Sequence, residues 1–377
     1  METEQSKRFP AVDLIRGLCI INVVLHHTNI RIPFARSPAG QLLPDTVIRF
    51  LFWTGDYSVK IFFVISGFLI TTSILSRWGS LSGVNVRDFY RRRFARIAPC
   101  LLGLLAILSV LQLLRVPGFT IAAGRASLPR ALLAALTLHL NWLEARTGYL
   151  PGSWDILWSL SVEETFYLIY PLLCRFGNRL VLAGVAAMLL AAGPFARTVL
   201  AFNDIWSDYS WFSGMDAIAL GCLTALICTR FQPSSAIRWW LRAAGIVIAL
   251  CVLFRKVAQA LGLLSTGLDV TVLATGIALI LISIRADSGK GILRPVAWFG
   301  RNSYEVYLTH MLVVTSATQL YIRLGSPVNY APVWFLGTLG ISGLLGHVVA
   351  HSYSIPWNRR LTGAKVKRNS ERIQSCS

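Results

Sequence analysis

Charged residues are scarce in this chain. They make up 14% of its 377 residues, whereas hydrophobic residues make up 55%. A soluble domain with so few charges could not cover its surface with polar groups. Acidic residues are the scarcest, at 17 against 36 Lys and Arg, so the net charge is +19. Nucleic acid is not the expected partner, because the basic residues flank long apolar runs and such residues fix membrane topology.

Several chemical signatures are missing. The sequence has no Gly-x-Ser-x-Gly, no Gly-x-x-x-x-Gly-Lys and no His-Glu-x-x-His, which excludes the nucleophile elbow, the P-loop and the zincin motif. No His is followed by Asp at the fifth position, which excludes the soluble-headed glycerolipid acyltransferase type. The seven cysteines show no Cys-x-x-Cys spacing and are interpreted as small buried hydrophobes. No metal site is expected.

Apolar runs near twenty residues recur along the chain and predict an all-α, polytopic transmembrane bundle. The segment 131–142 is too short to span comfortably and is expected to be re-entrant or interfacial. The first residues are polar and the first apolar run contains Arg16, which favours a retained helix over a cleavable signal. Ten spanning helices are predicted, at 11–30, 47–75, 97–115, 154–174, 180–200, 209–229, 240–256, 268–284, 295–322 and 332–355.

The basic residues predict the orientation. With the N-terminus inside and 131–142 not crossing, the inner loops and tails hold 23 Lys and Arg, and the outer loops hold 11. The positive-inside rule therefore favours ten crossings with both termini cytoplasmic. Residues 1–10 form an N-terminal tail, 11–355 the membrane domain, and 356–377 a basic C-terminal tail.

The first candidate site lies in the first apolar run. Arg16 and His27 are eleven residues apart, almost three helical turns, so they share one face about 16 Å apart along the axis. Asp13 can pair with Arg16 at i,i+3, whereas His26 lies off this face. An equally favoured alternative is that Asp13 and Arg16 form a structural salt bridge and that His27 bonds to a neighbouring helix. Ionisable groups inside a membrane are costly, however, and usually functional.

Two further segments offer candidate residues. Ser66-Gly67 in an apolar helix most often marks close helix packing, with a role at the site as the alternative, and snorkelling accounts for Lys60. A basic block follows on the inner side. These arginines would either fix the membrane topology or bind phosphate groups bidentately. The block contains Arg91, Arg92, Arg93 and Arg96.

The last two segments contribute acids and a second histidine. Glu163 and Glu164 enter a span together, and only one of them can face a given site because adjacent helix positions diverge by about 100°. A buried Glu needs a cation or a raised pKa, which makes one of them a partner for His27 or an Arg. His310 is more simply a helix–helix hydrogen bonder than a catalyst.

Taken together and in order, these segments resemble the acyltransferase 3 family of integral-membrane sugar O-acyltransferases. The resemblance runs from Asp13 to His310. It includes the Arg-x10-His of Arg16 and His27, and the segments 62–68, 92–99, 158–164 (with Trp158) and 303–310 (with Tyr304). One departure stands out, because members commonly have an acid just before the Phe-Phe-Val stretch, where this chain has Lys60. Asp56, Glu163 or Glu164 would have to replace that acid.

The resemblance implies transfer of an acyl group, most often acetyl, from acyl-CoA to a hydroxyl of a carbohydrate or other cell-envelope acceptor. The inner arginines would hold the nucleotide end of acyl-CoA. His27 would act as general base or as an acyl carrier, and Glu163 or Glu164 would orient its imidazole. The alternative is a secondary transporter, which also uses intramembrane Arg, His and Glu, although no repeated half is visible. A third hypothesis, a structural lipid-binding scaffold, does not explain why Arg16 and His27 share one helix face.

Overall fold

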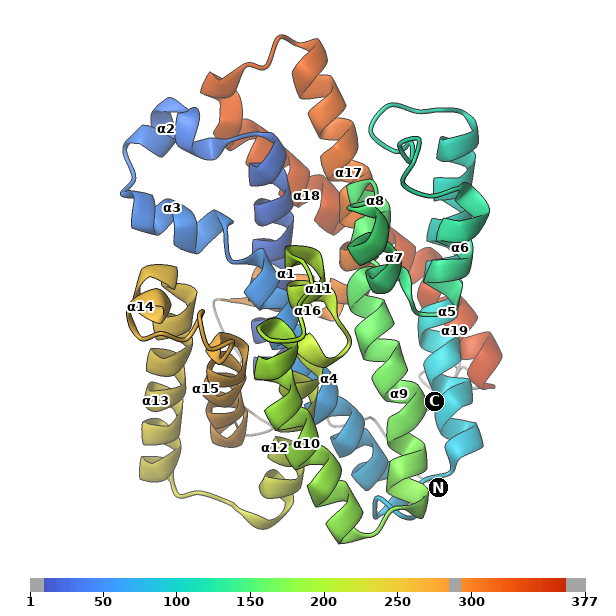
Figure 1. Cartoon of the computed structure of the whole chain (residues 1–377), viewed down its shortest axis with the longest axis vertical. Helices are drawn as coiled ribbons and strands as arrows, with labels where there is room; N and C mark the ends of the chain where they lie inside the picture. Colours follow the sequence, from blue (N-terminus) through green and yellow to red (C-terminus); the bar gives the residue numbers. More distant parts are fainter. Residues whose placement is uncertain (1–9, 285–292, 364–377) are drawn as a thin grey trace, which may run out of the picture.

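The computed structural model describes residues 10–284 and 293–363, and these residues form helices and no strand. The expected tails, 1–10 and 356–377, lie largely outside the described residues. Figure 1 shows the helices gathered in one bundle, with their axes mostly along its long direction. The five central helices are α1 (Pro10–Arg31), α4 (Gly55–Trp78), α9 (Trp158–Phe176), α12 (Phe212–Arg230) and α17 (Ser303–Arg323).

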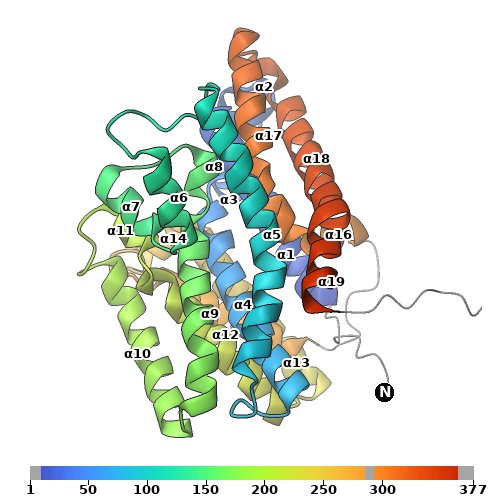
Figure 2. The same cartoon turned by 90° about the vertical axis from the view of Figure 1, so that its right-hand side faces the viewer.

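Other long helices pack around this centre. Figure 2 shows α17 beside α18 (Ala331–Val349), and α5 (Val86–Leu113) beside α19 (Ile355–Thr362), in agreement with the contacts between these elements. At the left of Figure 1, α13 (Ser235–Leu253) packs against α15 (Asp269–Ser283), whereas α10 (Arg179–Arg197) packs against α12. The remaining helices are short: α2 (Pro38–Gln41), α3 (Asp45–Phe52), α6 (Leu128–Leu136), α7 (Leu140–Thr147), α8 (Gly152–Asp155), α11 (Asp204–Tyr209), α14 (Arg255–Ala260) and α16 (Arg294–Arg301).

Glycines set the closest helix contacts. A Cβ on Gly67 of α4 would overlap the carbonyl oxygen of Ile218 on α12, and one on Gly221 of α12 would overlap that of Val64. Gly17 of α1 meets α16 in the same way. Small residues allow backbones to approach this closely, and packing of this kind drives helix association in lipid. Close packing therefore accounts for Gly67, as predicted, and it turns the neighbouring Ser66 to another face.

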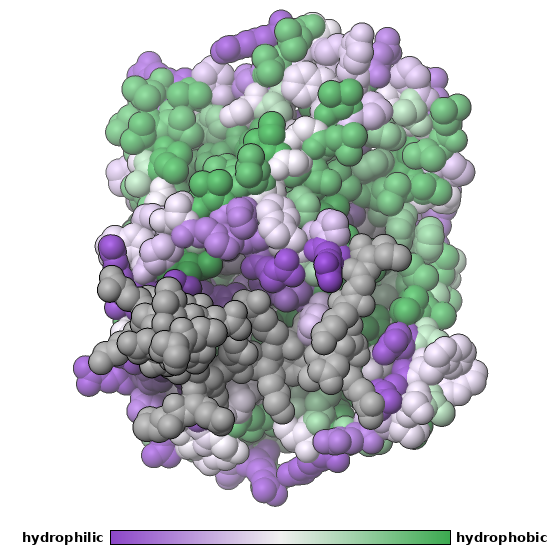
Figure 3. Space-filling model, turned by 180° about the vertical axis from the view of Figure 1, so that it is seen from behind, coloured by the Kyte–Doolittle hydropathy of each residue, from purple (hydrophilic) through white to green (hydrophobic). Residues whose placement is uncertain are grey.

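Seven helical stretches among the described residues are long and apolar enough to cross a membrane. Figure 3 shows a face whose upper part is largely hydrophobic, with hydrophilic residues across its middle and lower part. The other three expected spans correspond to α9, α15 and α17. All three contain acidic residues, and α15, with 15 residues, is about 22 Å long against a hydrocarbon core of about 30 Å. The membrane bundle is confirmed, whereas the count of ten spans is not.

Several expected spans are interrupted or shifted. The stretch 47–75 is divided at Trp53–Thr54 into α3 and α4, and 295–322 is divided at Asn302 into α16 and α17. The span expected at 97–115 begins eleven residues earlier, because the Asn85 side chain caps α5 by accepting from the Asp88 N–H. The arginine block is therefore part of a continuous helix. Apolar length alone does not reveal such caps and breaks.

The short apolar stretch 131–142 forms parts of α6 and α7. The two helices meet at Leu138, whose φ of +60° breaks the run. With nine and eight residues, α6 and α7 are each less than about 15 Å long, too short to cross. Neither these two helices nor the four-residue α8 belongs to the stretches that are long enough to cross, so all three lie outside the spanning segments.

The glycine contacts give a testable contrast in stability. Gly67→Ala is expected to lower the free energy of unfolding by about 1–3 kcal/mol, because the new methyl overlaps the α12 backbone. Gly184→Ala on α10 is the control, since nothing lies within 4 Å of a Cβ there. It should raise the free energy of unfolding by about 0.5–1 kcal/mol, as expected for alanine in a helix interior. Denaturation in detergent measures both, and equal shifts would contradict the packing account.

Candidate active site

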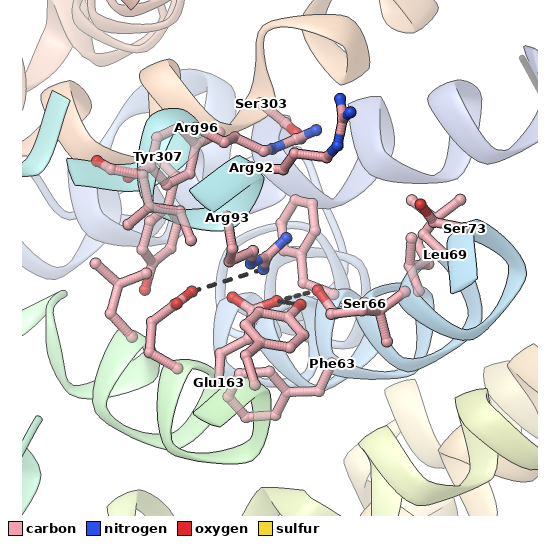
Figure 4. Close-up of a pocket in the computed structure, with 18 of the residues that line it drawn as sticks. Phe63, Ser66, Leu69, Ser73, Arg92, Arg93, Arg96, Glu163, Ser303 and Tyr307 are labelled. Atoms are coloured by element: carbon pink, nitrogen blue, oxygen red, sulfur yellow. Dashed lines mark hydrogen bonds and ion pairs between the residues drawn. The ribbon is translucent and has the colours of Figure 1, made fainter. Parts of the chain in front are cut away.

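A cavity of about 480 Å³ lies among α1, α4, α5, α9, α17 and α19. Along α4 its lining runs from Val59 to Arg77, which is about 27 Å by helix rise. Figure 4 shows side chains from several helices converging on it. Its charged and hydroxyl-bearing lining residues include Arg16, Ser66, Arg77, Arg92, Arg93, Arg96, Glu163, Glu164, Tyr304 and Tyr307. The cavity is therefore long, narrow and rich in cations.

Five arginines line this cavity, and α5 supplies three of them. Arg92, Arg93 and Arg96 lie on one side of α5 because positions three and four residues apart share a helix face. Arg91, also expected to bind the donor, is not among the lining residues. It is exposed and pairs with Asp88 at 2.7 Å. Arg91 therefore points away from the cavity that Arg92, Arg93 and Arg96 line.

The two glutamates occupy different positions on the cavity wall. Glu163 accepts hydrogen bonds from Ser66 and from the Tyr167 hydroxyl, the latter at 2.7 Å. Glu164 lies 3.6 Å from the Arg93 guanidinium, which also stacks 3.5 Å above the Tyr167 ring. Ser66 and both glutamates therefore line the cavity, and each carboxylate has a partner.

Neither glutamate orients the His27 imidazole. Within the described chain, the hydrogen bonds and ion pairs of Glu163 and Glu164 go to the cavity residues named above. The ring of His27 lies instead beside that of His310, with centroids 5.2 Å apart. Of the two partners expected for a glutamate, His27 or an Arg, the structure places an Arg beside Glu164, because α9 turns both carboxylates toward α4 and α5.

His310 connects His27 with the cavity. Its Nδ1 lies 2.6 Å from the Tyr307 carbonyl oxygen, and its ring lies 5.8 Å from the Tyr307 ring. Tyr307 closes one end of the cavity, where its hydroxyl bonds Ser159 at 2.8 Å and donates to the Ile156 carbonyl. Two aromatic rings therefore separate the cavity from His27. Sequence reasoning missed Tyr307 and Ser159, although both lie in segments that it singled out.

His26 and His27 have different surroundings. The Nδ1 of His26 lies 3.0 Å from the Phe52 carbonyl oxygen, and its ring packs on Trp53 and against Gly55. His26 therefore holds the junction of α3 and α4, whereas His27 faces α17. This agrees with the helical-wheel argument that only His27 shares a face with Arg16.

Lys60 is not a snorkelling residue. It is 5% exposed, its Nζ donates to the Asp208 carbonyl oxygen at 2.8 Å, and it lies 4.9 Å from the Trp158 ring centroid. The ammonium group is therefore held between a backbone carbonyl and an aromatic face. Trp158, expected near the site, is buried beneath Lys60 and does not line the cavity.

The remaining predicted residues lie at the cavity or close to it. Arg16 lines it, and its charge interacts with those of Asp13, Glu163 and Glu305. Tyr304 lines it and donates to the Ile97 carbonyl at 2.9 Å. Asp56 lies apart, 3.8 Å from Arg255. Among the described residues no group of three or more His, Cys, Asp or Glu could hold a metal ion.

Comparison with known proteins identifies relatives. Residues 9–351 match the family model of an acyltransferase domain. The chain is 26% identical over 360 residues to YrhL of Bacillus subtilis (strain 168), which covers 87% of this chain and 52% of the relative. It is 25% identical over 356 residues to the O-acetyltransferase OatA of Staphylococcus aureus (strain NCTC 8325 / PS 47), covering 87% and 54%.

A third relative is the peptidoglycan O-acetyltransferase OatA of Listeria monocytogenes serovar 1/2a (strain ATCC BAA-679 / EGD-e). It is 25% identical over 349 residues, covering 84% of this chain and 51% of the relative. The chain thus spans about half the length of these relatives. No solved structure matches it.

The two adjacent histidines should differ in their effect on stability. His26→Ala is expected to lower the free energy of unfolding by about 2 kcal/mol, because it removes a ring packed against Trp53 and Gly55 and its bond to the Phe52 carbonyl. His27→Ala should lower it by less than about 1 kcal/mol, since only imidazole contacts are lost. Thermal unfolding in detergent compares them, and the reverse order would refute this assignment of roles.

Proposed function

The chain belongs to the acyltransferase 3 family, and from that premise we propose that it is a membrane-embedded O-acyltransferase. It transfers an acyl group, most often acetyl, from cytosolic acyl-CoA to a hydroxyl of a cell-envelope carbohydrate. The observation that supports this most is the arginine-lined cavity, which ends two aromatic rings from His27. The proposed place is a bacterial inner membrane, with both termini cytoplasmic.

The proposed donor is acyl-CoA, which combines phosphates with a long flexible arm. Arg92, Arg93 and Arg96 would bind the phosphates, since guanidinium groups match phosphate geometry bidentately. The arm would follow α4, along which the cavity extends about 27 Å. Its thioester would then reach the end closed by Tyr307, whose side chain must move aside to bring the thioester to His27.

The proposed chemistry is general-base catalysis at His27. The imidazole takes the proton of the acceptor hydroxyl, and the hydroxyl oxygen attacks the thioester carbonyl carbon. The new C–O bond forms and the C–S bond breaks. The leaving CoA thiolate takes the proton from the imidazolium, so the products are an ester and a free thiol. An acyl-histidine intermediate, formed by attack of the imidazole itself, is the alternative route to the same products.

The proposed acceptor is a glycan of the cell envelope. Two relatives are O-acetyltransferases, and one of them is called a peptidoglycan O-acetyltransferase. A peptidoglycan strand is therefore the first acceptor to test. The competing function is a secondary transporter, which would also place Arg, His and Glu inside a membrane. Such a protein would bind solute without consuming a thioester.

Release of CoA thiol from acetyl-CoA is the direct test of this function. With a peptidoglycan glycan as acceptor, His27→Ala is expected to lower kcat at least about 100-fold, because the general base is lost. His26→Ala, the adjacent control, should retain kcat within about threefold when assayed below its unfolding temperature. Absence of thiol release by the unaltered protein with acetyl-, propionyl- and longer acyl-CoA, despite binding of another solute, would favour the transporter.

The donor assignment is tested with two arginines of α5. Arg96→Gln is expected to raise the KM for acetyl-CoA about 10-fold or more, since a charge-assisted phosphate contact is lost. Arg91→Gln is the matched control, because Arg91 lies on the same helix but outside the cavity lining. Its KM should stay within about twofold. Equal effects of the two substitutions would contradict a donor site in this cavity.

A further inference from the structure

A second polar cluster adjoins His27 on the side away from the cavity. Arg31, one helical turn beyond His27 on α1, donates to the His27 carbonyl at 3.0 Å, and its charge interacts with that of Asp155. The Tyr209 hydroxyl donates to Asp155 Oδ1 at 3.1 Å. Arg31, Asp155, Tyr209 and His27 are all only partly buried. The cluster therefore joins three distant segments of the chain beside His27.

Asp155 is held by a second carboxyl group. Glu144 of α7 is fully buried, accepts from the Leu150 N–H at 3.0 Å and lies close enough to Asp155 for their charges to interact. Burial raises the pKa of both carboxyl groups, and the nearby Asp155 charge raises that of Glu144 further. The Tyr209 hydroxyl donates to one carboxylate oxygen of Asp155, which leaves Asp155 capacity to accept further hydrogen bonds.

The cluster differs from a purely structural ion pair. On α10, Arg197 donates to the Gly267 and Ser213 carbonyls, to both carboxylate oxygens of Asp216 and to Thr271, so its guanidinium is fully used. Arg31 has a single hydrogen bond among the described residues, to its own helix. Arg31 therefore has donors available for a ligand.

Buried polar atoms without partners lie around the same place. In the described chain, no hydrogen bond reaches Nε2 of His310, which is fully buried beside His27, or Oε2 of Glu144. Buried polar groups are normally paired with protein or with water. These atoms flank Asp155 and His27 and thus point to an additional polar species in this part of the molecule.

An aromatic surface completes the cluster. Tyr209 stacks on Trp158 with centroids 4.2 Å apart and an interplanar angle of 6°, and Tyr149 meets Tyr209 edge to face at 6.0 Å. Tyr149 is 53% exposed. Sugar rings present an apolar face of C–H groups and an edge of hydroxyls. An exposed tyrosine beside a carboxylate and a guanidinium matches both surfaces.

We propose that Arg31, Asp155 and Tyr209 form the acceptor half of the site and bind a sugar ring whose reactive hydroxyl reaches His27. Asp155 accepts hydrogen bonds from the sugar hydroxyls, and Arg31 donates to a carbonyl or ring oxygen of the same sugar. Tyr149 packs against the apolar face of the ring. This inference rests on the proposed transferase function, and it places donor and acceptor on opposite sides of the His27–His310 pair.

Equilibrium binding tests the acceptor site without requiring turnover. The probes are radiolabelled chitotetraose, a β-1,4-linked tetramer of N-acetylglucosamine, and acetyl-CoA, each bound to the full chain in detergent. Asp155→Asn and Arg31→Lys are expected to weaken chitotetraose binding at least 10-fold and to leave acetyl-CoA affinity within twofold. Retained acetyl-CoA affinity shows that each variant is folded. The control Asp204→Asn, an exposed acid that begins α11, should change neither affinity.

The outcomes separate the two proposals. Unchanged chitotetraose binding in both variants, or equal loss of both ligands from them, would overturn the acceptor site. Asp155-dependent sugar binding in a protein that never releases CoA thiol would support the acceptor site and refute the transferase function. When turnover is measured, the substitutions should raise the KM for the sugar at least 10-fold, and a fall in kcat alone would contradict a binding role.

Discussion

Charge inside an apolar bundle is the constraint on which this structure depends. Each ionised side chain at the centre of a membrane helix costs about 2.5–3.5 kcal/mol or more unless it finds a partner or a cavity. The protein meets this cost in two ways. Arg197 and Asp216 satisfy each other and their surroundings completely, which joins α10, α12 and α15. The arginines of α5 instead line a cavity, where their charge is available to a ligand.

Backbone contact decides which side chains reach that cavity. Gly67 and Gly221 bring α4 against α12, and the residue before Gly67, Ser66, then faces α9 and donates a hydrogen bond to Glu163. The cap at Asn85 acts similarly for α5, since it extends the helix through the arginine block and gives each arginine a fixed direction. Arg96 and Arg91 differ in role because five residues on a helix turn the side chain by about 140°.

Helical periodicity was sufficient to predict part of the site. The separate surroundings of His26 and His27 follow from the residue spacing, and the structure shows them, with His26 at the Phe52 carbonyl and His27 beside His310. Partners from other helices did not follow. The sequence favoured Glu163 or Glu164 beside His27, whereas His310 lies there, because the rotation of α9 is set by its packing. Lys60 was expected to snorkel toward the membrane surface because it is a lysine near the end of a predicted span. Its burial is explained by two partners from other segments, the Asp208 carbonyl and the Trp158 ring.

The rings of Tyr307 and His310 lie between the cavity and His27. In the proposed reaction, a thioester brought from one side must be kept from water until an acceptor hydroxyl arrives from the other, since water at the same base would hydrolyse it. Tyr307 is held over the cavity end by its bonds to Ser159 and the Ile156 carbonyl, and Ile156 directly follows Asp155. A sugar that engages Asp155 would therefore act on the segment that holds Tyr307 closed. Binding of acceptor and access of the thioester to His27 would then be coupled through two adjacent residues.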